Sequence, residues 1–286
     1  MSGRQLRLQA VLAEQLRPVL RGVLWQIGLC AQELLRRALL LLMGTVVERA
    51  DDAALVLPAK SSAARLFLTC EHASERLPDP WVWHPEDRWL AGTHWAYDIG
   101  AELLTRDLAE ATGAPAVLSR FSRLLVDPNR EEDSPGLILE RAEGKLVVLN
   151  HGLESDEREA RLSRLHRPYH QAIDRELGRS RAPVVLALHT FTPVWNGVPR
   201  EVEVGVLFDR EDELAELARR ELEKTGLVVR MNEPYSGQAG LIYSAARHAD
   251  AHGLKALELE LRQDLALVVD VRAKVVDALS ALARAL

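Results

Sequence analysis

From Leu66 to the C-terminus, short apolar segments alternate with longer segments in which apolar residues recur every three or four positions. The short segments predict strands at 65–70, 115–121, 183–191, 203–209, 226–232 and 254–261. The periodic segments predict helices at 87–112, 155–179, 211–225 and 238–253, and a last helix from about Asp264 to the end. This alternation favours an α/β fold, a three-layer sandwich with a mostly parallel central sheet.

The first 60 residues have a different pattern. Leu and Arg recur there at helical spacing, with Pro18 and Gly28 as expected breaks, and 51–65 has the composition of a linker. We therefore expect an amphipathic helical extension and linker at 1–60 and a catalytic domain at 61–286. The extension could pack on the domain, support self-association, or bind a membrane surface.

No transmembrane span is expected in the extension. Its longest uncharged run, 38–47, is about half of the ~20 residues that a bilayer requires. That run also lies far from Met1 and lacks a following cleavage site of small residues, so we expect no signal peptide.

Charge and cysteine content narrow the function classes. The formal net charge is −6, and the Arg residues are spread among Asp and Glu without forming a basic block. Nucleic acid is therefore not an expected partner. The two cysteines, Cys30 and Cys70, are too few for a disulfide framework and do not form a CxxC motif. We expect free thiols and a cytoplasmic location.

Ionisable side chains lie in or next to four predicted strands. They are Glu71 and His72 after the first strand, Arg120 and Arg123 at the end of the second, His189 in the third, and Glu258 and Glu260 in the last. Ligands of open α/β sheets bind beyond the carboxyl ends of the strands. We therefore expect these residues to share one site.

His72, Asp98 and His189 form a candidate set of zinc ligands. Two imidazoles and one carboxylate suit zinc and leave a fourth position for water. Glu75 is an alternative carboxylate ligand, because His72 and Glu75 have the HxxE spacing of carboxypeptidase-like zinc enzymes, and Glu71 is another. Each residue of the set also fits an ordinary role: a turn cap for His72, a helix N-cap for Asp98, and a core position for His189.

An ordered series of segments resembles the N-formylglutamate amidohydrolase family. The segments are "CEHASERLP", "HWAYDIGA", "SRFSRLLVDPNRE", "PYHQAID", "LHTFTPVWNG", "VGVLF", "NEPYSG" and "LELELRQDL". Together they run from about Leu66 to Asp264, so they are more specific than any single motif. The first 60 residues lie outside the resemblance.

The resemblance implies a zinc-dependent hydrolase with a carboxypeptidase-like fold of the zinc-exopeptidase or phosphorylase-hydrolase type. Such enzymes release formate from N-formyl-L-glutamate in histidine degradation. Relatives often carry Asn in place of Glu75, which favours Asp98 as the carboxylate ligand. We expect one zinc ion per chain, held by His72, Asp98 and His189.

Glu260 is the expected general base, with Glu258 in reserve. Side chains alternate along a strand, so these two residues share one face while Leu259 and Leu261 point into the core. A solvent-facing edge strand is the ordinary alternative. His170, in a predicted helix, is a further candidate for an acid or for a hydrogen-bond partner of a ligand.

A dianionic substrate such as N-formylglutamate calls for guanidinium groups. The expected substrate-binding residues are Arg120, Arg123, Arg130, Arg262, Thr192, Asn232 and Tyr235, although one or two of the arginines could form surface ion pairs instead. His84, His166, His248 and His252 are expected at the surface, and His94 and His151 receive no role.

Three functions remain open from the sequence. The first is a zinc amidohydrolase acting on N-formylglutamate or a close N-acyl amino acid, with a small molecule as its partner. The second is an amidase of the same fold acting on another N-acyl amino acid, a peptide or a peptidoglycan fragment. The third is a non-catalytic assembly protein that uses the N-terminal helices. Retention of the candidate ligands and of both strand glutamates favours an enzyme.

Overall fold

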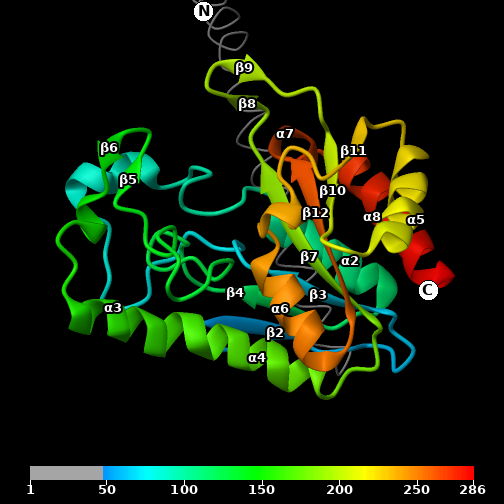
Figure 1. Cartoon of the computed structure of the whole chain (residues 1–286), viewed down its shortest axis with the longest axis horizontal. Coiled ribbons are helices and arrows are strands. Elements are labelled where there is room, and N and C mark those ends of the chain that lie inside the picture. Colours follow the sequence, from blue (N-terminus) through cyan, green and yellow to red (C-terminus); the bar gives the residue numbers. More distant parts are fainter. Residues whose placement is uncertain (1–47) are drawn as a thin grey trace, which may run out of the picture. The chain divides into compact units, whose positions relative to one another are not determined.

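An eight-stranded mixed sheet organises residues 48–286, the part of the chain that the computed structural model describes. Its strands lie in the order β1 (Arg49–Ala50), β2 (Ala54–Leu57), β4 (Ala116–Ser119), β3 (Leu66–Cys70), β7 (Val184–Phe191), β12 (Lys255–Arg262), β10 (Val204–Leu207) and β11 (Val229–Met231) (Figure 1). The pairs β4–β3, β3–β7, β7–β12 and β10–β11 are parallel. The three remaining pairs are antiparallel, so the sheet is mostly parallel, as predicted.

Helices cover both faces of this sheet. One face carries α2 (Ala101–Thr112), α5 (Asp212–Glu223), α7 (Gln263–Ala266) and α8 (Val269–Ala285), and the other carries α4 (Arg167–Leu177) and α6 (Tyr243–His252) (Figure 1). Each face of the sheet has its own hydrophobic core, because side chains alternate between the faces along a strand. In β12, Leu257 and Leu259 belong to the first core and Ala256 to the second. The predicted three-layer α/β sandwich is confirmed.

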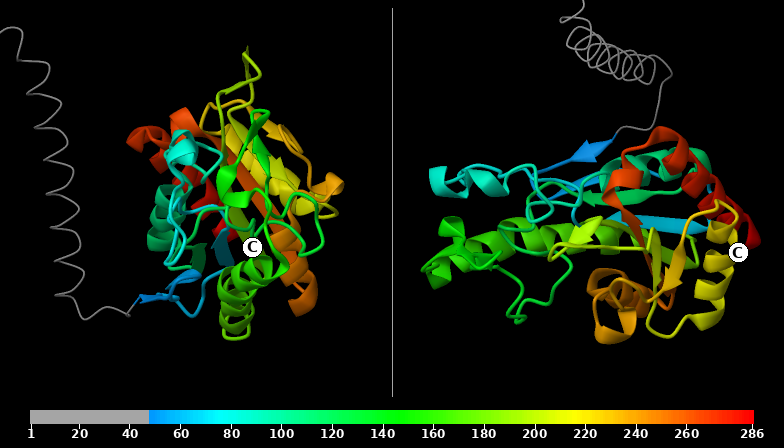
Figure 2. Two further views of the ribbon diagram at one scale, coloured as in Figure 1. Left: turned by 90° about the vertical axis from the view of Figure 1, so that its left-hand side faces the viewer. Right: turned by 90° about the horizontal axis from the view of Figure 1, so that it is seen from above.

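Shorter elements complete the described chain. They are the helical turns η1 (Pro85–Leu90), η2 (Val148–Asn150) and η4 (Gly237–Ala239), the helix α3 (Ser155–Arg161) continued by the π-helical segment η3 (Leu162–His166), and the hairpins β5–β6 (Arg141–Ala142, Lys145–Leu146) and β8–β9 (Val194–Trp195, Val198–Pro199). The β8–β9 hairpin projects from the sheet at the top of the left view in Figure 2.

The predicted helix at 87–112 is wrong for its first half. Only α2, from Ala101, is α-helical, and residues 91–100 form turns. Gly100 explains the late start: its φ of 92° lies in the left-handed region, and a Cβ there would lie 2.8 Å from the Cβ of Ala266. Residues with side chains are disfavoured in that conformation, so the chain turns at Gly100 before α2 begins.

The predicted linker at 51–65 is also wrong in part. Residues 54–57 form β2, which pairs with β4 along its whole length, and Ala54 and Val56 are buried. Alternation over only four residues gave too short a signal to separate this strand from a linker. The compact unit begins at Glu48. The expected helical extension lies outside the described residues.

No helix of residues 48–286 is both long enough and apolar enough to cross a membrane.

Candidate metal centre

A pocket of about 210 Å³ opens where β3 and β7 end. His72 follows β3 by two residues, and His189, Thr190 and Phe191 close β7. Glu258 and Glu260 enter from the adjacent β12, which pairs with β7 in parallel and places Glu260 opposite His189. The carboxyl ends of parallel strands therefore bring these residues together, as expected from the fold.

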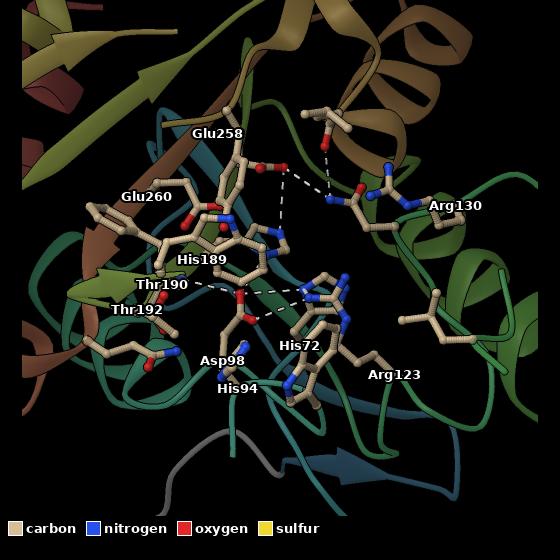
Figure 3. A pocket seen from close by; sticks show the side chains of 18 residues that line it. His72, His94, Asp98, Arg123, Arg130, His189, Thr190, Thr192, Glu258 and Glu260 are labelled. Atoms are coloured by element: carbon tan, nitrogen blue, oxygen red, sulfur yellow. Dashed lines mark hydrogen bonds and ion pairs between the residues drawn. The ribbon is translucent and has the colours of Figure 1, made fainter. Parts of the chain in front are cut away.

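His72, Asp98 and His189 converge at the bottom of this pocket (Figure 3). Asp98 Oδ2 lies 2.9 Å from His189 Nδ1 and 3.4 Å from His72 Nδ1. All three side chains are buried, and their ligand atoms lie within 4.8 Å of one another. Two imidazole nitrogens and one carboxylate oxygen thus face one point.

The Nε2 atoms of His72 and His189, which point away from the shared centre and are called the outer nitrogens below, are both paired with buried carboxylates. His72 Nε2 lies 2.8 Å from Asp127 Oδ1, and His189 Nε2 lies 3.0 Å from Glu71 Oε2. Ionised carboxylates only accept hydrogen bonds, so both Nε2 atoms carry the proton. This fixes the tautomer that leaves Nδ1 available, the usual arrangement of a metal-binding histidine.

A neighbouring arginine supports the same tautomer. Arg123 Nη1 lies 3.2 Å from His72 Nδ1, and because a guanidinium only donates, that Nδ1 must accept. Arg123 also donates to Asp127 Oδ2 at 2.6 Å. Asp127 therefore orients both the histidine and the arginine.

Acidic neighbours control protonation at His189. Burial lowers the pKa of His189, but the charge of Glu258 and hydrogen bonds to Asp98 and Glu71 outweigh burial, and its pKa lies well above the ordinary value. Burial also raises the pKa of Asp98, yet the histidines hold it far below its usual range. A cation at Nδ1 would compete with a proton for the same lone pair, so metal binding at His189 should weaken as the pH falls.

This donor set fits zinc. Tetrahedral zinc with ligand bonds of 2.0–2.1 Å places neighbouring ligand atoms about 3.3 Å apart, close to the 2.9 and 3.4 Å found around Asp98 Oδ2. Three protein ligands with one side open to a pocket are typical of catalytic rather than structural zinc sites.

The two strand glutamates lie beside the candidate ligands. Both are buried on the face of β12 opposite Leu259 and Leu261, as predicted, and β12 is a central strand. Glu258 Oε2 accepts from Asn129 Nδ2 at 3.3 Å, and burial raises the pKa of Glu258 to about 7. Burial also raises the pKa of Glu260, whose Oε2 has no hydrogen-bond partner within residues 48–286.

Among the four predicted arginines, only Arg123 and Arg130 reach the pocket. Arg120 instead donates to the backbone oxygen of Asp51, and Arg262 pairs with Asp264. The substrate-binding role predicted for Arg120 and Arg262 is therefore not supported, because their guanidinium groups point to other partners.

Thr192 and Tyr235 line the pocket, whereas Asn232 does not. Its side-chain oxygen accepts from the backbone N–H groups of Phe208 and Gly237, so Asn232 shapes a loop. Glu75 accepts a hydrogen bond from the Gly92 backbone and belongs to neither group of candidate ligands. Glu71 lies behind His189 rather than at the point where the ligand atoms converge.

His170 lies outside the pocket. Its Nδ1 is 2.8 Å from His248 Nε2, and His248 Nδ1 is 2.7 Å from Asp174. With His166, it lines a second pocket of about 170 Å³. The expected surface positions of His166 and His248 are wrong, since both are buried. The burial of His166, His170 and His248 was not predicted, because each has polar neighbours in the sequence.

Several pocket residues were missed from the sequence. Asn129 holds Glu258, and His94, Trp95 and Trp195 form an aromatic wall. Asn129 lies in "LVDPNRE", and His94 and Trp95 lie in "HWAYD". Both stretches belong to the segments that carry the family resemblance, which was the one signal in the sequence that pointed to these residues. Trp95 and Trp195 are far apart in the sequence, so their proximity could not be predicted from it.

Comparisons with known proteins give a family match and two similar solved structures. A family model described as N-formylglutamate amidohydrolase matches residues 64–267. Gene product Atu2144 from Agrobacterium tumefaciens is 32% identical over 82% of this chain and 94% of that one, with a TM-score of 0.74. The N-formylglutamate amidohydrolase from Ralstonia eutropha JMP134 is 22% identical over 82% and 96%, with a TM-score of 0.61, and shares the fold. A search of curated proteins gives no match.

Proposed function

Because the chain belongs to the N-formylglutamate amidohydrolase family, we propose that it is a zinc-dependent enzyme that hydrolyses the amide bond of N-formyl-L-glutamate or of a close N-acyl amino acid. The family supports a hydrolase that acts on amides. One observation supports the zinc dependence: the Nδ1 atoms of His72 and His189 converge with an oxygen of Asp98. The Nε2 atoms of both histidines are already paired with other carboxylates.

His72, Asp98 and His189 would hold the ion. Bound there, zinc supplies Lewis acidity toward the acyl oxygen and lowers the pKa of a water molecule toward neutrality. Glu71 and Asp127 keep the imidazoles in the required tautomer and orientation. Buried carboxylates around two histidines thus prepare the site before the ion binds.

Glu260 is the proposed general base. It lies next to the candidate ligands, in one ligand-forming group with His189 and Glu258, and its Oε2 is free to accept a proton from the attacking water. The same carboxyl group then passes the proton to the leaving amine. Glu258, held by Asn129 and 3.6 Å from His189, is better placed to stabilise the histidine.

Arg130 is the proposed anchor for the substrate carboxylate. It lines the pocket and forms no salt bridge with any carboxylate of residues 48–286. In Figure 3 it lies across the pocket from Thr190 and Thr192. Thr192 Oγ1 is buried without a partner in the described chain and would donate a hydrogen bond to the acyl oxygen.

Removal of the metal tests the proposal. Dialysis against a chelator is expected to lower formate release from N-formyl amino acids by at least a hundredfold, because the Lewis acid is lost. One equivalent of zinc per chain should restore the rate, and magnesium should not, because imidazole ligands disfavour it. Undiminished formate release after complete removal of zinc would rule out a metal-dependent reaction.

The small volume of the pocket favours a small N-acyl amino acid over a peptidoglycan strand. Histidine degradation as the pathway and the cytoplasm as the location stay predictions, as does self-association through the N-terminal segment.

A further inference from the structure

Arg200 lies at the base of the β8–β9 hairpin, among aromatic rings of the pocket. Its guanidinium carbon is 5.3 Å from the ring centre of each of Phe191, Trp195 and Tyr235. All three rings line the pocket, although Arg200 itself does not. The Arg200 backbone N–H donates to the oxygen of Pro193 at 2.9 Å, which closes the hairpin. Three cation–π contacts therefore hold this guanidinium in one place at the edge of the pocket.

The charge of Arg200 has no carboxylate partner within residues 48–286. The neighbouring Arg262 donates to the Arg200 backbone oxygen at 3.1 Å and pairs with the nearby carboxylates of Glu203 and Asp264. The Arg200 side chain instead donates to Tyr235 Oη from both Nη atoms, at 3.3 and 3.4 Å. These distances are long for hydrogen bonds to oxygen. A partly buried cation with only a phenol oxygen as its acceptor is well suited to bind a carboxylate.

Tyr235 supplies a second donor at the same place. A guanidinium only donates, so Tyr235 Oη accepts from Arg200 and its own proton is available to another acceptor. Burial raises the pKa of Tyr235, so the phenol keeps this proton at neutral pH. The described residues place no acceptor beside it. Arg200 and Tyr235 thus form a pair of donors that one carboxylate could accept from.

Other pocket atoms also lack partners in the described chain. They are His94 Nε2 and Gln263 Nε2, both buried. The amide nitrogen of Gln263 only donates, and a buried donor without an acceptor is costly. The rings of His94 and Trp195 are 6.1 Å apart, so His94 and Arg200 lie against the same tryptophan. This side of the pocket therefore suits the oxygen atoms of a ligand.

Two guanidinium groups at the pocket are unpaired in the part of the chain that the structure describes. They are Arg130 and Arg200, whereas Arg123 is paired with Asp127 at 2.6 Å. In Figure 3, Arg130 lies on a different side of the pocket from His94, the neighbour of Arg200. The two unpaired charges are thus separated, as are the two carboxylates of an acidic N-acyl amino acid.

We propose that Arg200, assisted by Tyr235, binds the side-chain carboxylate of an acidic N-acyl amino acid and so determines the specificity of the site. Arg130 binds the α-carboxylate in this arrangement, and the acyl group lies at the candidate metal ligands. Water adds to the acyl carbon, the C–N bond breaks, the amine takes the proton, and the carboxylic acid and the amino acid leave. This inference rests on the proposed amidohydrolase function, and Arg200 was not among the substrate-binding residues predicted from the sequence.

The test compares N-formyl-L-glutamate with N-formyl-L-glutamine, which has nearly the same shape without the side-chain charge. kcat/KM for formate release is measured with the zinc-loaded full chain, and the wild type should prefer the glutamate substrate by about a hundredfold or more. Arg200→Met keeps an unbranched side chain among the three rings. It should lower kcat/KM about a hundredfold for the glutamate substrate and leave the glutamine substrate within about threefold. Arg200→Lys should keep part of the preference, about tenfold, because an ammonium lacks the guanidinium fork.

Two further variants make this result interpretable. Tyr235→Phe removes one donor and should lower kcat/KM about tenfold for the glutamate substrate alone, so it tests the subsite even if Arg200→Met does not fold. Arg230→Met, on the exposed side of β11 and outside the pocket, controls for the loss of a positive charge and should change neither substrate. A purely structural role of Arg200 and Tyr235 would lower both substrates alike in all of their variants. That result, or a wild type that does not distinguish the two substrates, would overturn the proposal.

Failure of the subsite and failure of the reaction give different results. A preference for glutamate that Arg200→Met leaves unchanged would overturn the role of Arg200 and leave the amidohydrolase function standing. If no N-formyl amino acid is cleaved, the proposed function fails, and calorimetric binding of the same two compounds decides the subsite. Tighter binding of N-formylglutamate that is lost in Arg200→Met would support it. Equal binding of the two compounds, an unchanged preference in the variant, or no binding at all would overturn it.

Discussion

Glu260→Gln is expected to lower kcat roughly a thousandfold, within the range that general bases contribute, while zinc stays bound. Glutamine keeps the size and burial of the side chain but cannot take a proton from water. The Glu260 side chain is buried beside His189 with one oxygen unpartnered in the described chain, as a base waiting for its substrate water would be. A cation at the neighbouring ligands would favour the ionised form that burial alone disfavours.

Two variants make this result interpretable. Glu213→Gln, on the exposed side of α5, controls for the substitution itself and should leave kcat unchanged. Glu258→Gln should cost less than Glu260→Gln, because Glu258 is already engaged by Asn129. A larger loss of kcat in Glu258→Gln would reverse the assignment of the base. Steady-state kinetics with zinc content measured on the same samples gives the comparison.

Arg161→Met is expected to lower the free energy of unfolding by about 3 to 5 kcal/mol, because several acceptors lose their donor at about 1 to 3 kcal/mol for each one left buried and unsatisfied. Arg161, in α3, is 1% exposed. It donates to the backbone oxygens of Leu125 and Leu149, to Asn150 Oδ1 at 2.6 Å and to Glu157 at 2.8 Å. Methionine fills the space but leaves these buried acceptors without a donor.

Denaturant unfolding measures this loss. Arg158→Met, one turn earlier on the exposed side of α3, is the matched control and should change stability by less than about 0.5 kcal/mol. The network holds the irregular segment that leads through Asp127 and Arg130, so zinc affinity should fall as well. A stability equal to that of the control would mean that the segment is held by its apolar contacts alone.

Sequence pattern predicted the layers of this fold well. The predicted segments correspond to β3, β4, β7, β10, β11 and β12, because each is a short apolar run with a clear boundary. The ordered segments that indicated the family were also confirmed by the family model. Since parallel strands carry their carboxyl ends to one edge, the grouping of His72, His189 and Glu260 followed from the fold.

Side-chain direction outside regular strands could not be predicted in the same way. Arg120 and Arg123 follow β4, where the chain leaves the sheet and alternation no longer applies, and they point to different partners. Arg130 reaches the pocket from the irregular segment between β4 and β5, where no strand periodicity gives the direction of a side chain. The contact between Trp95 and Trp195 likewise depends on tertiary packing between distant segments.

The types of the residues that converge in the pocket were predictable from the sequence, but the position of each carboxylate was not. HxxE spacing made Glu75 a reasonable alternative, yet the turn after His72 takes its carboxylate to the Gly92 backbone. Glu71 and Asp127 were recognisable as acidic residues, but only the geometry places them on the outer nitrogens of the two histidines.

The central claim is that His72, Asp98 and His189 hold a zinc ion on which amide hydrolysis depends. The most direct measurement is elemental zinc content per chain for wild type, His72→Ala and the exposed control His151→Ala, with formate release assayed on the same samples. The account predicts about one zinc and full activity in wild type and His151→Ala, and loss of both in His72→Ala. One zinc per chain retained in His72→Ala, or activity retained without zinc, would contradict it.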